Sequence, residues 1–163
     1  MTLAEAAARA DELAQAGDER AVADMRKEWA DEVEGAARSS DYRERAVAYR
    51  AIGQFRFRQK LELLRRGLED ESPACRGSAL VSLELLSRDG PAPVNSARSL
   101  LHRLVTADEN QAVRRLAALT LKNGSPQRDT IVLLEGLADD DRLERPLREA
   151  TARVAALLKK KSR

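Results

Sequence analysis

Few side chains in this sequence have the types and spacing that catalysis requires. His102 is the only histidine and Cys75 the only cysteine, so a Ser/His or Cys/His pair would have to include one of them. His102 stands beside Leu101 and Leu104 in a leucine-rich segment, which favours a surface or packing histidine over a catalytic base. A small buried hydrophobe is likewise favoured over a reactive thiol at Cys75. These residues do not predict a catalytic site.

Metal and phosphate chemistry have equally little support in the sequence. Three consecutive carboxylates, Asp139 to Asp141, precede an expected helix, where helix capping and the helix dipole explain them more simply than a metal site. The chain has no CxxC spacing and no glycine-rich phosphate loop. We therefore expect a protein that is not an enzyme, with no cofactor, no bound metal and no small-molecule substrate.

One segment has a distinctive chemical character. Residues 38–66 hold nine bases and three acids, for a net charge of plus six, and contain both tyrosines and both phenylalanines. Residues 1–37 hold ten acids and four bases, for a net charge of minus six. The cations of the basic segment outnumber its acids, so some must face solvent, a partner or the acidic amino-terminal segment. If the acidic segment lies against them, part of the positive charge is neutralised internally, which disfavours nucleic-acid binding.

Internal repeats predict the elements that carry these residues. A pattern of leucine, aspartate, arginine and alanine recurs at intervals of 31, 38 and 33 positions. The matched residues are Arg45, Ala48 and Ile52; Asp70, Arg76, Ala79 and Leu83; Asp108, Arg114, Ala117 and Leu121; and Asp141, Ala150 and Val154. Apolar residues at helical spacing on both sides of an acidic turn predict two helices per repeat. Such a hairpin cannot bury its apolar faces alone, so we expect neighbouring hairpins to stack.

The pattern Asp-x-Ser/Asn-x-x-Val-Arg-x-x-Ala-Ala-x-x-Leu resembles the second half of a HEAT repeat, of the short bacterial type also found in phycobilin-lyase-like proteins. It stands here as Asp70, Ser72, Cys75, Arg76, Ala79 and Leu83, and as Asp108, Asn110, Val113, Arg114, Ala117, Ala118 and Leu121. The resemblance covers residues 20–158 and departs in the last repeat, where Leu147 replaces the arginine and Arg148 comes one position late. The family also includes hydroxylases that bind iron through His-Glu pairs, and this chain has no such pair.

The resemblance implies an all-α fold, a short right-handed α-solenoid of about four HEAT-like helical hairpins with an amino-terminal capping helix. We expect one domain over residues 1–163. The capping helix covers residues 1–17, the repeats cover residues 18–55, 56–88, 94–124 and 126–158, and a basic tail covers residues 159–163. The loop from Ser87 to Ser96, with its glycine and two prolines, is the longest expected break.

The stretch FRFRQK, from Phe55 to Lys60, joins the first two repeats. A strand is disfavoured because no other segment alternates with a period of two and could pair with it. The repeat register instead places Phe55 at the end of one helix and Phe57 ahead of the next, with both rings in the core. Arg56, Arg58 and Lys60 are then expected to be exposed.

In HEAT-like solenoids the second helices line a concave face where extended partners bind. We therefore expect a protein-interaction adaptor or scaffold that binds an acidic or extended protein partner. Because the single cysteine cannot form an internal disulfide and no apolar run approaches the length of a membrane span, we expect it in the cytoplasm and bound to no membrane. The predicted partner-binding residues are Arg43, Tyr49, Arg50, Arg56, Arg58 and Lys60. The alternative is a HEAT-like nucleic-acid-binding protein that uses the Arg/Lys cluster of residues 43–66.

Overall fold

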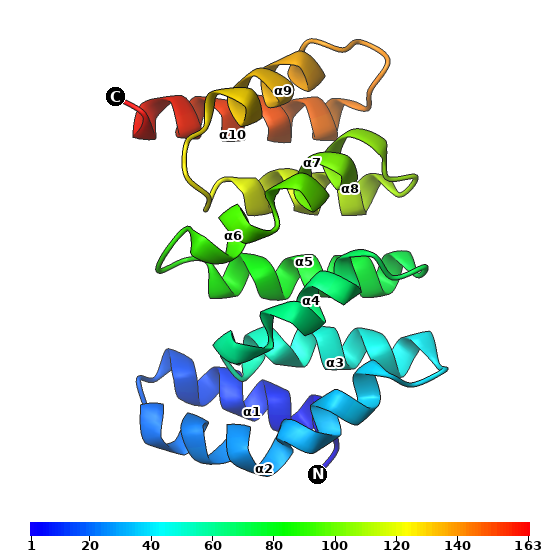
Figure 1. The fold of residues 1–163 in the computed structure, drawn as a ribbon, viewed down its shortest axis with the longest axis vertical. Helices are drawn as coiled ribbons and strands as arrows, with labels where there is room; N and C mark the ends of the chain where they lie inside the picture. Colours follow the sequence, from blue (N-terminus) through cyan, green and yellow to red (C-terminus); the bar gives the residue numbers. More distant parts are fainter. The chain divides into compact units, whose positions relative to one another are not determined.

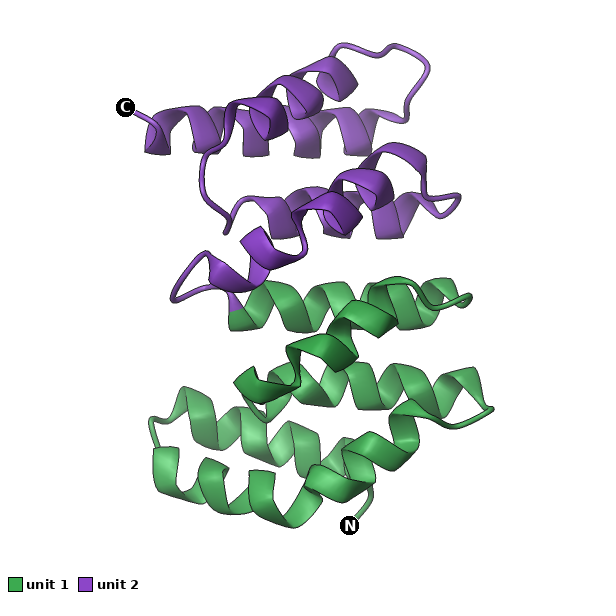
Figure 2. Cartoon of the chain, in the orientation of Figure 1, with its two compact units in different colours: residues 1–86 green, residues 87–163 purple.

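The computed structural model describes residues 1–163 and consists of ten α-helices and one short 3-10 helix, without strands. The predicted all-α class is confirmed. The chain forms two compact units, residues 1–86 (unit 1) and residues 87–163 (unit 2), shown in Figure 2. Their boundary falls at the beginning of the longest loop expected from the sequence. None of the helices combines the length and apolar character needed to cross a membrane.

Unit 1 contains α1 to α5 (Figure 1). Its elements are α1 (Leu3–Gln15), α2 (Glu19–Ala37), α3 (Tyr42–Gln54), the 3-10 helix η1 (Arg58–Lys60), α4 (Leu61–Leu68) and α5 (Pro73–Leu86). α1 packs against α2 and α3, and α5 packs against α3 and α4. The second helices of two successive predicted repeats, α3 and α5, therefore lie side by side.

The crossing of α3 and α5 is close because a glycine faces a serine. The amide of Gly53 donates to Ser82 Oγ at 3.0 Å, and Ser82 Oγ donates to the carbonyl of Arg50 at 3.0 Å. A Cβ atom at Gly53 would lie 2.7 Å from Ser82 Cα, too close for any side chain. The absence of a side chain at residue 53 thus sets the distance between the two helices.

Unit 2 contains α6 (Ala92–Ser96), α7 (Arg98–Ala107), α8 (Gln111–Leu121), α9 (Arg128–Ala138) and α10 (Arg145–Lys161). α7 packs against α8, and α10 packs against α9 and α8, so second helices are again neighbours within the unit. The short helix α6 lies where the sequence predicted only a loop. Pro93 stands in its first turn, where proline is tolerated, and Val94 is completely buried, which explains why this segment is ordered.

A short aspartate turn recurs before every second helix. The side chains of Asp41, Asp70 and Asp108 each accept a hydrogen bond at 2.9 Å from the backbone N–H of the residue two positions later, and Asp140 does so at 3.0 Å. This side-chain hydrogen bond stabilises the turn between two helices. In the last repeat Asp140 has this role, whereas the side chain of Asp141, which the sequence pattern selected, is 99% exposed. The sequence register is therefore displaced by one residue in that loop.

The junction FRFRQK ends α3 with a reversal typical of helix carboxyl ends. The amide of Phe57 donates to Ile52 O at 2.9 Å and that of Arg56 donates to Gly53 O at 3.0 Å. This pair of bonds requires a left-handed residue between them, and Arg56 has a φ of 60°. The burial predicted for both phenylalanines is confirmed, since Phe55 is 0% and Phe57 1% exposed, with ring centroids 5.4 Å apart.

Candidate interaction site

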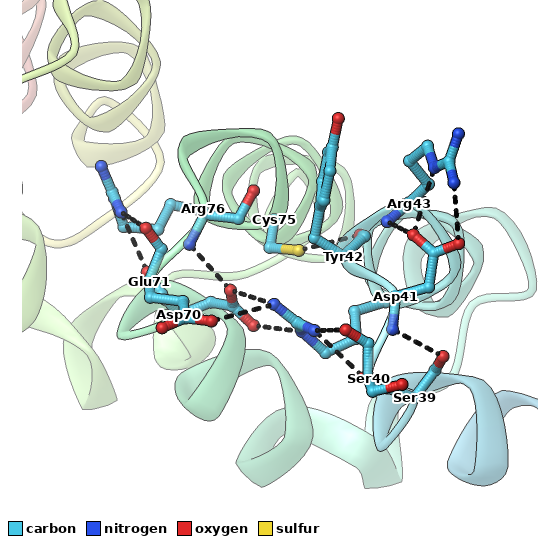
Figure 3. Close-up of polar contacts among 11 residues, drawn as sticks. Ser39, Ser40, Asp41, Tyr42, Arg43, Asp70, Glu71, Cys75 and Arg76 are labelled. Atoms are coloured by element: carbon cyan, nitrogen blue, oxygen red, sulfur yellow. Dashed lines mark hydrogen bonds and ion pairs between the residues drawn. The ribbon is translucent and has the colours of Figure 1, made fainter.

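A polar cluster joins α3 to the loop before α5 (Figure 3). The Arg45 guanidinium donates to both oxygens of Asp70, at 2.9 and 3.1 Å, and to the carbonyl of Ser39 at 3.0 Å. Arg76, at the same position of the next repeat, donates to the carbonyls of Asp70 at 2.9 Å and Glu71 at 3.2 Å. Both arginines therefore fasten the loop between the helices.

The charges of this cluster are mutually stabilised. Burial alone would raise the pKa of Asp70, but hydrogen bonds from Arg45 and the Ser72 amide outweigh it and hold the pKa below its ordinary value. The hydrogen bond to Asp70 in turn raises the pKa of Arg45. The side chains of Arg45 and Asp70 are only 13% and 8% exposed. This pair is a structural clamp and offers little surface to a ligand.

The cysteine beside this cluster is held as a thiol. Cys75 is completely buried, its Sγ donates to the carbonyl of Tyr42 at 3.2 Å, and burial raises its pKa (Figure 3). A buried neutral thiol is a poor nucleophile. Tyr42 itself, the first residue of α3, is half exposed and is the exposed aromatic side chain beside this cluster.

In unit 2 the corresponding arginines bind main-chain carbonyls. Arg114 donates to Val105 O at 3.0 Å and to Thr106 O at 2.9 Å. In the last repeat Leu147 occupies the arginine position and is completely buried, while Arg148 reaches the carbonyl of Leu143 at 3.1 Å. The late arginine therefore still bonds the loop before its own helix.

The structure removes Tyr49 from the predicted contact surface. Tyr49 is 4% exposed, because α4 covers its ring at Gly67: a Cβ there would lie 2.9 Å from Tyr49 Cδ1. Burial also raises the pKa of the phenol. The prediction that this ring meets a partner is therefore corrected to a packing role between α3 and α4.

Arg56 is not the exposed cation that the sequence predicted. Its guanidinium donates to Asp11 of α1 at 2.8 Å and to the carbonyls of Gly53 and Gln54 at 2.9 and 3.1 Å. It thus satisfies carbonyls at the end of α3 and binds the acidic helix α1. Its side chain is 19% exposed.

Lys60 is also used inside unit 1. Its ammonium lies 2.6 Å from Glu34 of α2 and 5.1 Å from the centroid of the Phe57 ring, and its side chain is 12% exposed. The hydrogen bond from Lys60 holds the pKa of Glu34 below its ordinary value. The acidic amino-terminal helices therefore neutralise part of the basic segment, which the charge distribution suggested without identifying the pairs.

Three predicted cations keep access to solvent. Arg43 is exposed on the first turn of α3 and forms an ion pair with Asp41 at 3.2 Å, with its side chain 76% exposed. Arg58 is exposed and donates to the carbonyl of Leu86 at the end of α5. Arg50 is half-buried on α3. These residues, with the half-exposed Tyr42, form the part of the predicted site that a partner can reach.

A buried polar network in unit 2 was not expected from the sequence. Arg98 donates to Thr130 Oγ1 at 3.0 Å and also bonds Asn95 Oδ1, while His102 Nε2 lies 2.9 Å from the same threonine oxygen. Burial lowers the pKa of both Arg98 and His102. The network crosslinks α7 and α9, and the only signal for it was two polar residues in a leucine-rich helix.

The acidic residues do not assemble a metal site. No group of three or more His, Cys, Asp or Glu side chains is arranged to hold a metal ion. Within the Asp139 to Asp141 run, Asp140 binds the backbone and guanidinium of Arg142, each at 3.0 Å. The run therefore serves the turn before α10.

Comparison with known proteins does not assign a family. No protein-family model matches the chain, and no curated protein matches its sequence.

Proposed function

We propose that this chain is a non-enzymatic adaptor with HEAT-like helical repeats, stacked as a short right-handed α-solenoid, that binds an acidic or extended protein partner. The partner would lie along the second helices and the exposed cations of the first repeats. The observation that carries this proposal is the side-by-side packing of second helices within each unit, α3 with α5 and α8 with α10. Such neighbours form a continuous surface to which an extended chain can bind.

The contacts of the polar residues singled out in the sequence support a scaffold over a catalyst. Arg45, Arg76 and Arg114 all bond loops between helices, while Cys75 and His102 are held neutral by burial. The three arginines and Cys75 are thereby committed to structural contacts, and His102 bonds Thr130. The exposed cations of unit 1 are then the candidate contacts for a partner.

Nucleic-acid binding is the weaker alternative. Arg56 and Lys60 form ion pairs with Asp11 and Glu34, and the ring of Tyr49 is too buried to stack on a base. A phosphate-binding groove needs several free cations along its length. In the basic segment of unit 1, the exposed cations alternate with cations that are already paired with acids.

The test is a pulldown from the native host with a triple variant, Arg43→Glu, Arg50→Glu and Arg58→Glu. We expect loss of a specific partner, at least about tenfold in recovery, because repulsion replaces attraction at the binding face. Arg56 and Lys60 stay unchanged, since reversing either would break a contact with α1 or α2. Undiminished recovery of the partner by a folded triple variant would remove these cations from the proposal.

A matched control reverses two exposed cations elsewhere in unit 1. Arg20 and Lys27 are exposed on α2, a first helix. Arg20→Glu with Lys27→Glu should leave recovery unchanged. Equal losses in both variants would show a nonspecific charge effect. Binding of DNA or RNA that falls steeply with salt would instead favour the nucleic-acid alternative.

A further inference from the structure

The first three helices surround a groove with apolar walls and an acidic rim. Leu3 of α1, Ala36 of α2 and Val47 of α3 line it, together with Glu32 and Glu44. Both glutamate side chains are exposed, and, beyond the hydrogen bond with Asp41, the charge of Glu44 contributes to the raised pKa of Arg43. The groove also contacts Arg43, whose guanidinium is bound to Asp41. The charge left uncompensated at the rim is therefore negative.

The last helix presents the opposite chemistry. Leu157 of α10 is 45% exposed, one of four large hydrophobic residues with such exposure. Arg153 stands four residues before it and Lys160 three residues after it, so both lie on the same face of the helix. Both cations are exposed and neither is bound to an acid. α10 therefore carries an apolar side chain between two free positive charges.

The two surfaces are complementary in their chemistry. The groove combines apolar lining residues with two carboxylates, and α10 has a leucine flanked along the helix by two cations. The wider charges match as well: residues 145–163 hold seven bases and one acid, or plus six, against minus six for residues 1–37. Opposite surfaces on one chain attract the corresponding surfaces of another copy.

We propose that these surfaces bind each other between two copies of this chain. Leu157 of one copy occupies the groove of the next, and Arg153 and Lys160 pair with Glu32 and Glu44. Because the two surfaces differ, the contact is heterologous: the copy that contributes α10 keeps its groove free, and the copy that contributes the groove keeps its α10 free. Copies therefore add head to tail into a ring or an open chain. This inference does not depend on the adaptor function.

Sedimentation velocity over a range of concentrations tests the association. We expect a mass that rises with concentration above the 18.0 kDa of the monomer, and less so at high salt. Leu157→Glu should lower the association constant by at least about tenfold, because a buried leucine side chain is lost and a like charge enters the acidic groove. A monomer at every concentration, or undiminished association of the variant, would overturn the proposal.

Val132→Glu provides a matched control in the same unit. Val132 of α9 is 57% exposed, and the substitution is chemically similar. Its neighbours one turn away, Asp129 and Glu135, are acidic, so this surface does not complement the groove. Association should be unchanged. A loss equal to that of Leu157→Glu would overturn the assignment to α10.

A mixing experiment distinguishes a heterologous contact from general stickiness. The Leu157→Glu chain keeps an intact groove, whereas a Glu32→Lys/Glu44→Lys chain keeps an intact α10. Each should be monomeric alone, because its own missing surface blocks self-association. Mixed in equal amounts they should form a dimer of twice 18.0 kDa that does not grow further. Absence of this dimer, with both variants folded by circular dichroism, would overturn the proposal.

Discussion

Units 1 and 2 bury their cations in different ways. In unit 1, Arg45 and Arg56 bind the carboxylates of Asp70 and Asp11. In unit 2, Arg98 is 9% exposed and all its hydrogen bonds go to neutral groups: the amide oxygen of Asn95, the carbonyl of Ser125 and the hydroxyl of Thr130. Arg45 and Arg56 of unit 1 thus have a carboxylate partner that Arg98 of unit 2 lacks, whereas Arg76 in unit 1 and Arg114 in unit 2 both bond main-chain carbonyls. The stability of the two units should therefore respond differently when a side chain that binds one of these arginines is removed.

The units also differ in their cores. All five aromatic residues, Trp29, Tyr42, Tyr49, Phe55 and Phe57, belong to unit 1, and unit 2 is built from aliphatic side chains. Tryptophan fluorescence therefore reports unit 1 alone, whereas far-UV circular dichroism reports both units. This difference supplies the measurement that separates their stabilities.

The largest effect is expected at Asp70. Asp70→Ala leaves the nearly buried guanidinium of Arg45 with only the exposed Glu71, 4.0 Å away, as a counter-charge, and the Ser72 amide without its acceptor. Removing one partner of a buried ion pair costs about 3–5 kcal/mol in unfolding free energy. Urea unfolding followed by Trp29 fluorescence measures this loss.

Asp140→Ala is the control in unit 2. Asp140 makes the same turn but pairs with Arg142, whose side chain is 89% exposed. Its loss should cost much less unfolding free energy than Asp70→Ala, since exposed ion pairs contribute little. Equal losses at the two aspartates would contradict the distinction between a clamped and a solvated turn.

The second-largest loss of stability is expected from a change in the spacing between α3 and α5. Gly53→Ala places a Cβ 2.7 Å from the backbone of Ser82, which cannot move away without separating α3 from α5. We expect a loss of about 1–3 kcal/mol from overpacking. Gly136→Ala on α9 meets no atom within 4 Å and should stabilise its helix by about 0.5–1 kcal/mol. Thermal unfolding of both variants checks these opposite signs, and a neutral Gly53→Ala would refute the close crossing.

The sequence predicted the helices and several core residues because these depend on local periodicity. Phe55 and Phe57 were placed in the core by the repeat register, and burial confirms it. The partners of Arg56 and Lys60 could not be predicted, because Asp11 and Glu34 lie 45 and 26 residues away in the chain. The sequence analysis therefore assigned Arg56 and Lys60 to the partner-binding surface. Long-range pairing, which periodicity does not encode, decides which surface remains free.

A smaller effect is expected for Arg98→Met. The substitution removes a cation that burial already disfavours and that no acid binds, and methionine fills similar space. The unfolding free energy should change by no more than about 1 kcal/mol, since the gain in desolvation offsets the lost hydrogen bonds. Urea unfolding by circular dichroism measures it. A loss as large as that of Asp70→Ala would show that neutral partners clamp as firmly as a carboxylate.

The smallest effect is a pH dependence confined to unit 2. Burial holds the pKa of His102 below its ordinary value of 6.5, so the folded state binds its proton less readily than the unfolded chain. The stability contributed by neutral His102 is complete above pH 6.5 and is lost as the pH falls through the lower folded pKa. Unit 1 has no histidine, and its paired carboxylates Asp70 and Glu34 have pKa values below 3.8 and 4.5. Between pH 6.5 and 5, the hydrogen-exchange protection factors, which correct for the slower intrinsic exchange at lower pH, should therefore fall in α7 and α9 and stay constant in α3 and α5. His102→Gln, which can still bond Thr130, should abolish the difference, and an NMR titration midpoint of His102 at or above 6.5 would contradict it.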